Sequence, residues 1–282
     1  MKKLLFIAIM LYSHQMLFAQ TTIDSVDIRI CYDVRMSYYK KRKKQMDEHR
    51  LDIGKNGISR YYSYWKCLDQ ELKDSVHAVG GNYDDYNRIK REKGYPNSKF
   101  AYTIFKNYQK AYQLTGICTP YSDGKFLFSE EMGQQWNLVG DSVYKVLDHP
   151  CRKATARFHG REWIAYYATD IPIPEGPWKL CGLPGLIMFA RDADKEYIFK
   201  CMAIKTHVNE PIVIDKRDAL EVRPQKLEKL LRDYYSNPLG AMNARLGGME
   251  ATFRDSKGQV INPQTMKIPE PVLLDYYGQN EQ

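Results

Sequence analysis

Side chains that could act as acids, bases, nucleophiles or metal ligands are spread singly along this chain. Its histidines beyond the first residues are His49, His77, His149, His159 and His207. None has ligand spacing to another on one element, so we interpret each as a surface or turn residue. His149 lies two residues before Cys151, and an adjacent imidazole lowers the pKa of a thiol. A half-buried strand cysteine is the favoured alternative at that position.

Catalytic sequence motifs are missing from the chain. It contains no G-x-S-x-G elbow, no H-E-x-x-H pair and no Gly-rich phosphate loop followed by Lys-Ser or Lys-Thr. Acidic pairs such as Glu130-Glu131 are adjacent, so their side chains would diverge in a strand. We therefore assign no catalytic residue and expect no metal site and no cofactor.

Aromatic residues are the one class in surplus, with 22 tyrosines in 282 residues. Four aromatic residues lie close together in the sequence: Trp163, Tyr166, Tyr167 and Trp178. At alternating strand positions aromatic side chains usually form sheet core. On a concave sheet the same side chains would hold an apolar or sugar-like ligand. We take these four as ligand-binding candidates, with Tyr166 and Tyr167 on opposite faces of their strand.

A second unusual stretch alternates glycine and proline with bulky aliphatic residues: Gly182, Leu183, Pro184, Gly185, Leu186 and Ile187. None of these side chains is an acid, base, nucleophile or metal ligand. We interpret the stretch as a structural bend. Gly185 would adopt a φ that other residues avoid, and Pro184 would fix the preceding torsion. Leu183, Leu186 and Ile187 would then enter the core.

Sequence periodicity predicts the elements that must position these residues. Period-two patterns indicate strands, and the pair around Asn56-Gly57 is typical of a hairpin. The expected strands are 23–36, 51–54, 58–64, 98–108, 125–129, 186–190, 196–204 and 250–254. Weak helical patterns cover 66–79 and 83–93, and 216–236 has the spacing of an amphipathic helix.

The clearest local geometry is a hairpin closed by His159-Gly160. This turn pairs Phe158 with Arg161, and it places small residues of one strand opposite large ones of the other. The expected further pairs are Ala156 with Trp163, Ala154 with Ala165, Arg152 with Tyr167 and, on the other face, Arg157 with Glu162. The segment 171–174, Ile-Pro-Ile-Pro, cannot form a normal ladder because proline lacks an N–H.

The first residues indicate export. Two lysines precede an apolar stretch that is too short for a bilayer span, and Ala19 supplies a small residue for cleavage. We expect a signal peptide at 1–19 and a single domain at 20–282, in which 210–282 forms a helix-containing C-terminal part. The mature chain would be periplasmic or secreted, without a transmembrane span.

Charge and cysteine content narrow the class of protein further. The formal net charge is +8, with one basic run at Lys40–Lys44. An exported protein has little access to nucleic acid, so we interpret the run as a solvated face and expect no nucleic-acid partner. Export also permits disulfides among Cys31, Cys67, Cys118, Cys151, Cys181 and Cys201. Their spacing does not select a pairing, and we expect one or two disulfides rather than three.

Several ordered elements between residues 136 and 201 resemble a known family. They include Trp136-Asn137-Leu138, Gly160-Arg161-Glu162-Trp163, Gly176-Pro177-Trp178-Lys179 and the stretch Gly182–Ile187. In this order they resemble the GLPGLI family of exported Bacteroidetes proteins, whose molecular role is largely undefined. The module is also similar to an N-terminal bowl-like β domain that precedes a peptide-N-glycosidase catalytic region. The stretch Pro269–Leu274 departs from the Asn-Pro-Ile-Glu-like tail of the family, and the resemblance supplies no catalytic residues.

Together these patterns predict an α+β fold: a curved, mostly antiparallel sheet forming a bowl or half-barrel, with one or two helices. The expected function is a non-catalytic binding or accessory module of the bacterial cell envelope. Its partner would be an envelope or outer-membrane protein, or an apolar or sugar-like ligand. The alternative is a hydrolase whose site is not visible as a sequence motif.

Overall fold

The computed structural model describes residues 21–40, 43–107, 113–121, 124–237, 253–254, 260–261 and 271–275. The expected signal peptide at 1–19 lies outside these residues, as do Lys41 and Arg42 of the basic run. The described residues form an α+β fold, as the sequence predicts.

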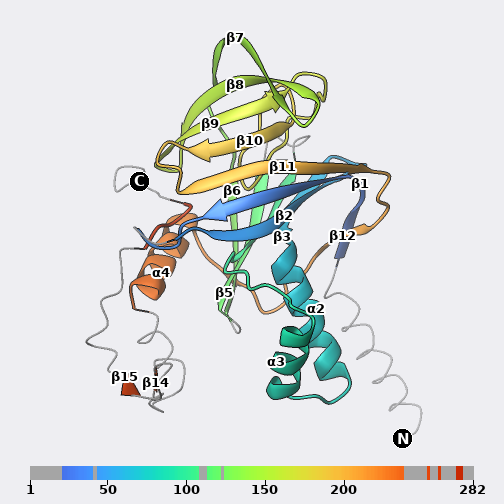
Figure 1. Cartoon of the computed structure of the whole chain (residues 1–282), viewed down its shortest axis with the longest axis vertical. Helices are drawn as coiled ribbons and strands as arrows, with labels where there is room; N and C mark the ends of the chain where they lie inside the picture. Colours follow the sequence, from blue (N-terminus) through green and yellow to red (C-terminus); the bar gives the residue numbers. More distant parts are fainter. Residues whose placement is uncertain are drawn as a thin grey trace, which may run out of the picture.

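One open sheet of thirteen strands dominates the molecule (Figure 1). Its order is β13-β6-β5-β4-β3-β2-β1-β11-β10-β9-β8-β7, with β12 paired to the start of β1. All pairs are antiparallel except β13 with β6. The strands are β1 (Thr21–Met36), β2 (Gln45–Gly54), β3 (Ile58–Ser63), β4 (Tyr102–Asn107), β5 (Gln113–Tyr121), β6 (Gly124–Glu131), β7 (Asn137–Val146), β8 (His149–Phe158), β9 (Arg161–Ala168), β10 (Ile187–Asp192), β11 (Tyr197–Thr206), β12 (Pro211–Ile214) and β13 (Leu220–Glu221). A separate pair joins β14 (Phe253–Arg254) to β15 (Val260–Ile261).

The sheet curls around its main hydrophobic core. In Figure 1 the strands from β11 to β7 stack upward, whereas β5 runs steeply behind them. We call the face that carries Tyr32, Trp163 and Phe199 the inner face, and the opposite one the outer face. The irregular segment 169–186 fills the inner face, where its buried Trp178 packs against Trp163. Helix α4 (Pro224–Ser236) joins the same core through Leu227 and Leu231.

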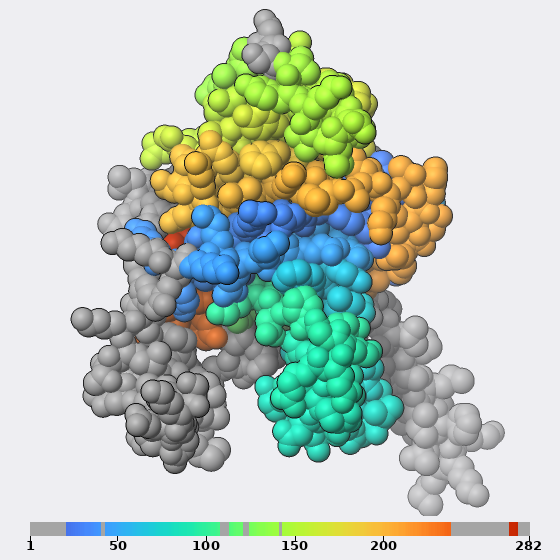
Figure 2. All heavy atoms as spheres, viewed as in Figure 1, coloured from blue at the N-terminus to red at the C-terminus, as the bar shows by residue number. Residues whose placement is uncertain are grey.

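Three helices lie in the described residues, rather than the one or two expected. Helix α2 (Tyr64–Ala78) begins where the Ser63 side chain accepts a hydrogen bond from the backbone N–H of Lys66. Helix α3 (Tyr83–Glu92) begins with a capping box formed by Asn82 and Asp85. Together α2 and α3 form a knob that projects from the sheet (Figure 2). No helix in the described part of the chain has the length and apolar character needed to cross a membrane.

Helix α4 begins later than the predicted 216–236. Residues 215–217 form a local turn instead, in which the Asp215 carboxylate accepts hydrogen bonds from the backbone N–H and the guanidinium of Arg217. The short strand β13 follows, and Pro224 then starts the helix at a position where a missing N–H has no cost.

The predicted hairpin of β8 and β9 is confirmed in every pair. Phe158 lies opposite Arg161, and the register continues as predicted through Arg152 and Tyr167. His159 and Gly160 both have positive φ, at 47° and 69°, which is the conformation of a two-residue hairpin turn. The β2–β3 hairpin and the pairing of β10 with β11 are also confirmed.

The stretch Gly182–Ile187 is a buried bend, and its glycine requirement differs from the prediction. Leu183, Leu186 and Ile187 are buried in the core, as expected. The prediction of a forbidden φ at Gly185 is wrong, because the positive φ, 86°, belongs to Gly182. Gly185 is instead required by space: a Cβ there would lie 1.8 Å from the carbonyl oxygen of Ala168.

All six cysteines are free thiols, so the expectation of one or two disulfides is wrong. Five of them are buried and Cys67 is half-buried. The five buried thiols act as small apolar residues of the strands and of the 169–186 segment, which is the usual role of an unpaired buried cysteine, whereas Cys67 lies on α2 and donates to Glu71.

Candidate functional site

Three of the four aromatic candidates lie in the core. Trp163, Tyr167 and Trp178 are buried on the inner face. Trp163 is stacked on Phe199 with ring centroids 6.0 Å apart, and its centroid lies 5.5 Å from that of Trp178. The indole N–H of Trp163 donates to the Phe158 carbonyl at 3.2 Å. The 169–186 segment therefore occupies the place where a ligand would sit in an open bowl.

Tyr166 lies on the outer face, opposite in direction to Tyr167, as the sequence predicts. Its half-exposed ring contacts Tyr144 of β7 at a centroid distance of 4.8 Å and Phe189 of β10 at 5.8 Å, both edge to face. Lys153 of β8 is the strand partner of Tyr166. The structure thus brings together three aromatic rings from three strands, of which the sequence pattern identified one.

Exposed apolar side chains continue from this cluster along β7 and the turn after it. Five large apolar side chains there are at least 39 % exposed: Leu138, Val139, Val143, Tyr144 and Leu147. No other stretch of the described chain has so many exposed large apolar side chains together. We call these five residues with Tyr166 the β7 edge surface. It covers one end of the sheet, at the top of Figures 1 and 2.

Strand β7 is also an open edge of the sheet. It pairs only with β8, so one row of its backbone N–H and C=O groups has no neighbouring strand among the described residues. The pairing shifts between Val139 and Val143, where a bulge interrupts the edge. The bulge divides the edge into two short segments, 137–139 and 143–146.

A cluster of ionisable side chains lies inside the curl of the sheet. The buried Lys179 ammonium forms salt bridges with Glu130 of β6 and with Asp275, the latter at 2.7 Å. His159 approaches both carboxylates at 3.9 Å. Burial and the neighbouring Lys179 lower the pKa of His159 to about 3, so its imidazole is neutral at pH 7. We call these four residues the Lys179 cluster. It joins β6, the 169–186 segment and the segment 271–275.

His49 corrects the interpretation of all histidines as surface or turn residues. It is completely buried on β2, where its Nδ1 is 2.5 Å from the Tyr61 hydroxyl and its Nε2 is 3.2 Å from Asp47. Ser98 and Ser63 donate to the same Asp47 carboxylate. Serine, histidine and aspartate of this kind could form a catalytic triad. Here the hydroxyls bond the carboxylate rather than the imidazole, so the group is a buried structural network.

The thiol Cys151 is a buried strand residue, in agreement with the favoured interpretation. Burial raises its pKa to about 11, so it is not an activated nucleophile. His149 is directed to Asp170 instead, at 2.9 Å.

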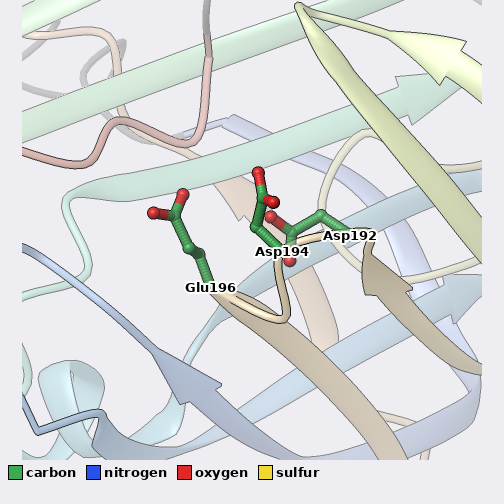
Figure 3. Close-up of side chains that lie close together, drawn as sticks. All are labelled: Asp192, Asp194 and Glu196. Carbon is green, nitrogen blue, oxygen red and sulfur yellow. The ribbon is translucent and has the colours of Figure 1, made fainter. Parts of the chain in front are cut away.

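An acidic trio lies in the turn between β10 and β11: Asp192, Asp194 and Glu196, with carboxylate oxygens within 4.8 Å of one another (Figure 3). Oxygen ligands of this type could hold a divalent cation. Arg161 already donates to Asp192 at 2.7 Å and to Glu196 at 2.8 Å. Its guanidinium therefore offsets the charge that would attract a cation. The same Arg161 donates to the Leu273 carbonyl, so this guanidinium links the segment 271–275 to the turn.

Comparison with known proteins gives a distant structural likeness. No family model matches the chain, and no curated protein matches it. Among solved structures it is similar to PNGF-II, a peptide-N-glycosidase, in two crystal forms, with TM-scores of 0.48 and 0.46 and 11 % identity in each. These matches cover 73 % of this chain and 33 % and 32 % of the PNGF-II chains. The matched part of this chain is therefore similar to about a third of PNGF-II.

Proposed function

We propose that this protein is an exported, non-catalytic binding or accessory module of the bacterial cell envelope, of the GLPGLI type. Export is supported by the basic head, apolar stretch and Ala19 of the first residues, and the type by the ordered elements from Trp136 to Ile187. The intact mass of the protein from the envelope tests export. A mature chain that begins at Gln20 is expected, and a retained Met1 would contradict it.

One observation supports binding above the others: the exposed apolar side chains and the open backbone edge coincide on β7. Leu138 and Val143 are 61 % and 60 % exposed, which is costly for a free aliphatic side chain. An extended polypeptide laid along β7 would pair with its free backbone groups and cover these side chains. We therefore infer that the partner is an envelope protein that supplies an extended segment.

The outer-face aromatic cluster defines one side of such a contact. Val139 and Tyr144 alternate onto the outer face beside Tyr166, whereas Leu138 and Val143 project to the other side. An added strand would thus meet apolar groups on both of its faces, with the positive charge of Lys153 nearby. A segment of apolar residues with an occasional acidic one fits this surface best.

Site-specific photocrosslinking tests the assignment. A benzoylphenylalanine at Val143 is expected to link one envelope protein in intact cells, and the same probe at Leu230 of α4 is not. Tyr144→Lys should weaken the crosslink without unfolding the domain, because a lysine on an edge strand opposes pairing. Equal crosslinking from Val143 and Leu230 would overturn the assignment, as would recovery of a bound apolar or sugar-like molecule in place of a protein.

The hydrolase alternative has its own observation, the two carboxylates of the Lys179 cluster with His159 beside them. A lysine between two carboxylates neutralises them, which favours a structural role. Assays with chromogenic ester, glycoside and peptide substrates between pH 4 and 8 distinguish a hydrolase from a structural role of this cluster. Turnover that Glu130→Gln abolishes in a folded protein would establish a hydrolase.

A further inference from the structure

A second accessible region lies on the outer face, between α2 and strands β4 to β6. It consists of two adjoining hollows with volumes of about 290 and 500 Å³. Lys66, Gln70, Lys125 and Asp215 line both of them. We call the two hollows together the α2 groove. Its walls come from sequence positions as distant as 60 and 218, and it is separate from the β7 edge surface.

The larger hollow has an excess of positive charge. Five cationic side chains line it against three carboxylates: Lys66, Lys73, Lys99, Lys125 and Arg217, with Asp69, Asp215 and Asp218. Asp69 is paired with Lys73 at 2.7 Å, and Asp215 is shared by Lys125 at 3.2 Å and Arg217 at 2.9 Å. The paired carboxylates thus leave part of the cationic charge without compensation.

Lys66 is the central group of the groove. Its ammonium donates to the Thr119 carbonyl at 2.8 Å and to the Thr119 hydroxyl at 2.6 Å. No carboxylate within the described residues lies at salt-bridge distance from it. An ammonium has three N–H donors, so these two bonds leave one for a ligand. Lys66 is part-buried, and a partly desolvated cation without a counter-charge is unfavourable, so an anion in the groove would supply that charge.

The smaller hollow adds an apolar wall. Phe105, Ile117 and Val213 line it, together with the guanidinium-bearing side chain of Arg60. Phe105 and Ile117 belong to a small outer core that β12 covers. A ligand that lies across both hollows would therefore meet apolar side chains at one end and Lys66, Lys125 and Lys99 at the other.

We propose that the α2 groove binds an oxyanion, a phosphate, sulfate or carboxylate group, that carries an apolar substituent. The oxyanion accepts hydrogen bonds from Lys66 and Lys125, and the substituent lies on Phe105 and Ile117. Such a group occurs both on small amphipathic metabolites and on the headgroup of an anionic lipid.

Calorimetric titration with three probes tests this assignment and separates the two sources. Inorganic phosphate should bind weakly, and hexyl phosphate about tenfold more tightly, the effect of burying about two methylene groups. Vesicles of phosphatidylglycerol, compared with phosphatidylcholine, report a headgroup source. Binding of hexyl phosphate without vesicle binding indicates a small soluble ligand.

Matched lysine variants give the deciding comparison. Lys66→Gln should lower hexyl phosphate affinity at least tenfold, whereas Lys229→Gln, an exposed lysine of α4, should not change it. If Lys66→Gln does not fold, Lys125→Gln provides the same test, because this lysine is a quarter exposed at the rim. Full affinity in a folded Lys66→Gln or Lys125→Gln variant would overturn the site.

A pH series adds an independent readout. Burial lowers the pKa of Lys66 to about 8, and hexyl phosphate is already a dianion above pH 7. Affinity should therefore fall as pH rises through about 8, and this fall should be absent in Lys66→Gln. Charged and titratable groups near Lys66 come from several elements: Asp47 of β2, Asp69 and Lys73 of α2, Cys118 of β5, Lys125 of β6 and Asp215 after β12. A constant affinity from pH 7 to 9.5 would contradict the role of Lys66.

Discussion

The two faces of the sheet use the same kinds of residue for opposite purposes. On the inner face, Trp163 and Tyr167 are covered by the chain's own 169–186 segment, whose Lys179 is itself buried. On the outer face, Tyr166, Tyr144 and Lys66 remain accessible to a partner or lie beside a hollow. The most conspicuous residues of the sequence are therefore core, and the accessible chemistry is assembled from ordinary residues far apart in the chain. Matched substitutions on the two faces test this contrast.

The largest effect is expected at Lys179. Lys179→Met leaves the carboxylates of Glu130 and Asp275 buried without their counter-charge, which should cost about 3–5 kcal/mol of unfolding free energy. Urea unfolding measures this, with Lys229→Met as the exposed control. Equal midpoints for the two variants would show that the Lys179 cluster does not hold the inner face together.

The adjacent tyrosines give the sharpest test of the two faces. Tyr167→Ala truncates a core side chain and should cost about 3 kcal/mol, whereas Tyr166→Ala should cost about 1 kcal/mol because its ring is half-exposed. In the crosslinking experiment, only Tyr166→Ala should lower the yield from a folded protein. Equal losses of binding at full stability for both would place both rings in the site and refute the assignment.

Two glycines of the bend are required for different reasons: Gly185 because a Cβ has no room, and Gly182 because its φ is positive. Gly185→Ala should cost about 1–3 kcal/mol because its Cβ meets the Ala168 carbonyl oxygen. Gly182→Ala should cost about 1 kcal/mol from its positive φ alone, since nothing lies within 4 Å.

Asparagine tells the two causes apart, because it tolerates positive φ but needs more room. Thermal unfolding should rank Gly182→Asn above Gly182→Ala in stability, and Gly185→Asn below Gly185→Ala. The reverse order at either position would contradict the assigned cause.

The smallest expected effect is a pH dependence from His159. Its pKa in the folded chain, about 3, lies below the ordinary value of 6.5, so the unfolded state binds more protons between these values. The unfolding free energy should thus be highest above pH 6.5 and fall by about 1 kcal/mol between pH 7 and 5.5 from this group. His159→Asn, which suits the positive φ of the turn, should remove that part of the slope. Urea unfolding at pH 7 and pH 5.5 measures this difference. If the unmodified chain and His159→Asn lose the same unfolding free energy between the two pH values, the imidazole of His159 is accessible to protons in the folded chain.

Sequence pattern predicted the local geometry better than the accessible sites. The β8–β9 register follows from a two-residue turn and alternating side chains, both of which are local properties. Strands β5 and β7 were missed, because Gly116 and Pro120 interrupt one and a bulge at Gly140 breaks the period of the other. Without β7, the partners of Tyr166 and the open edge could not be anticipated.

The groove residues could not be predicted for a different reason. Lys66, Thr119 and Asp215 are brought together only by the order of strands in the sheet, and none belongs to a local motif. The Lys179 cluster is similar, since Glu130, His159 and Asp275 meet only when the sheet curls. At Gly185 the sequence indicated that glycine is required, but the close approach of Ala168 is a tertiary contact that no local pattern encodes.

The segment 271–275 has a consequence for the order of folding. Its bonds reach far back in the chain: the Leu273 carbonyl accepts from Arg161 over 112 residues, and the Val272 carbonyl from Tyr197 over 75. Contacts of such separation form late, because the entropy of closing a long loop is lost before the contact is gained. As a chain emerges from its N-terminus, Lys179 is made and positioned well before Asp275 arrives. We therefore expect the contacts of the segment 271–275 to be among the last to form in the interior of the sheet.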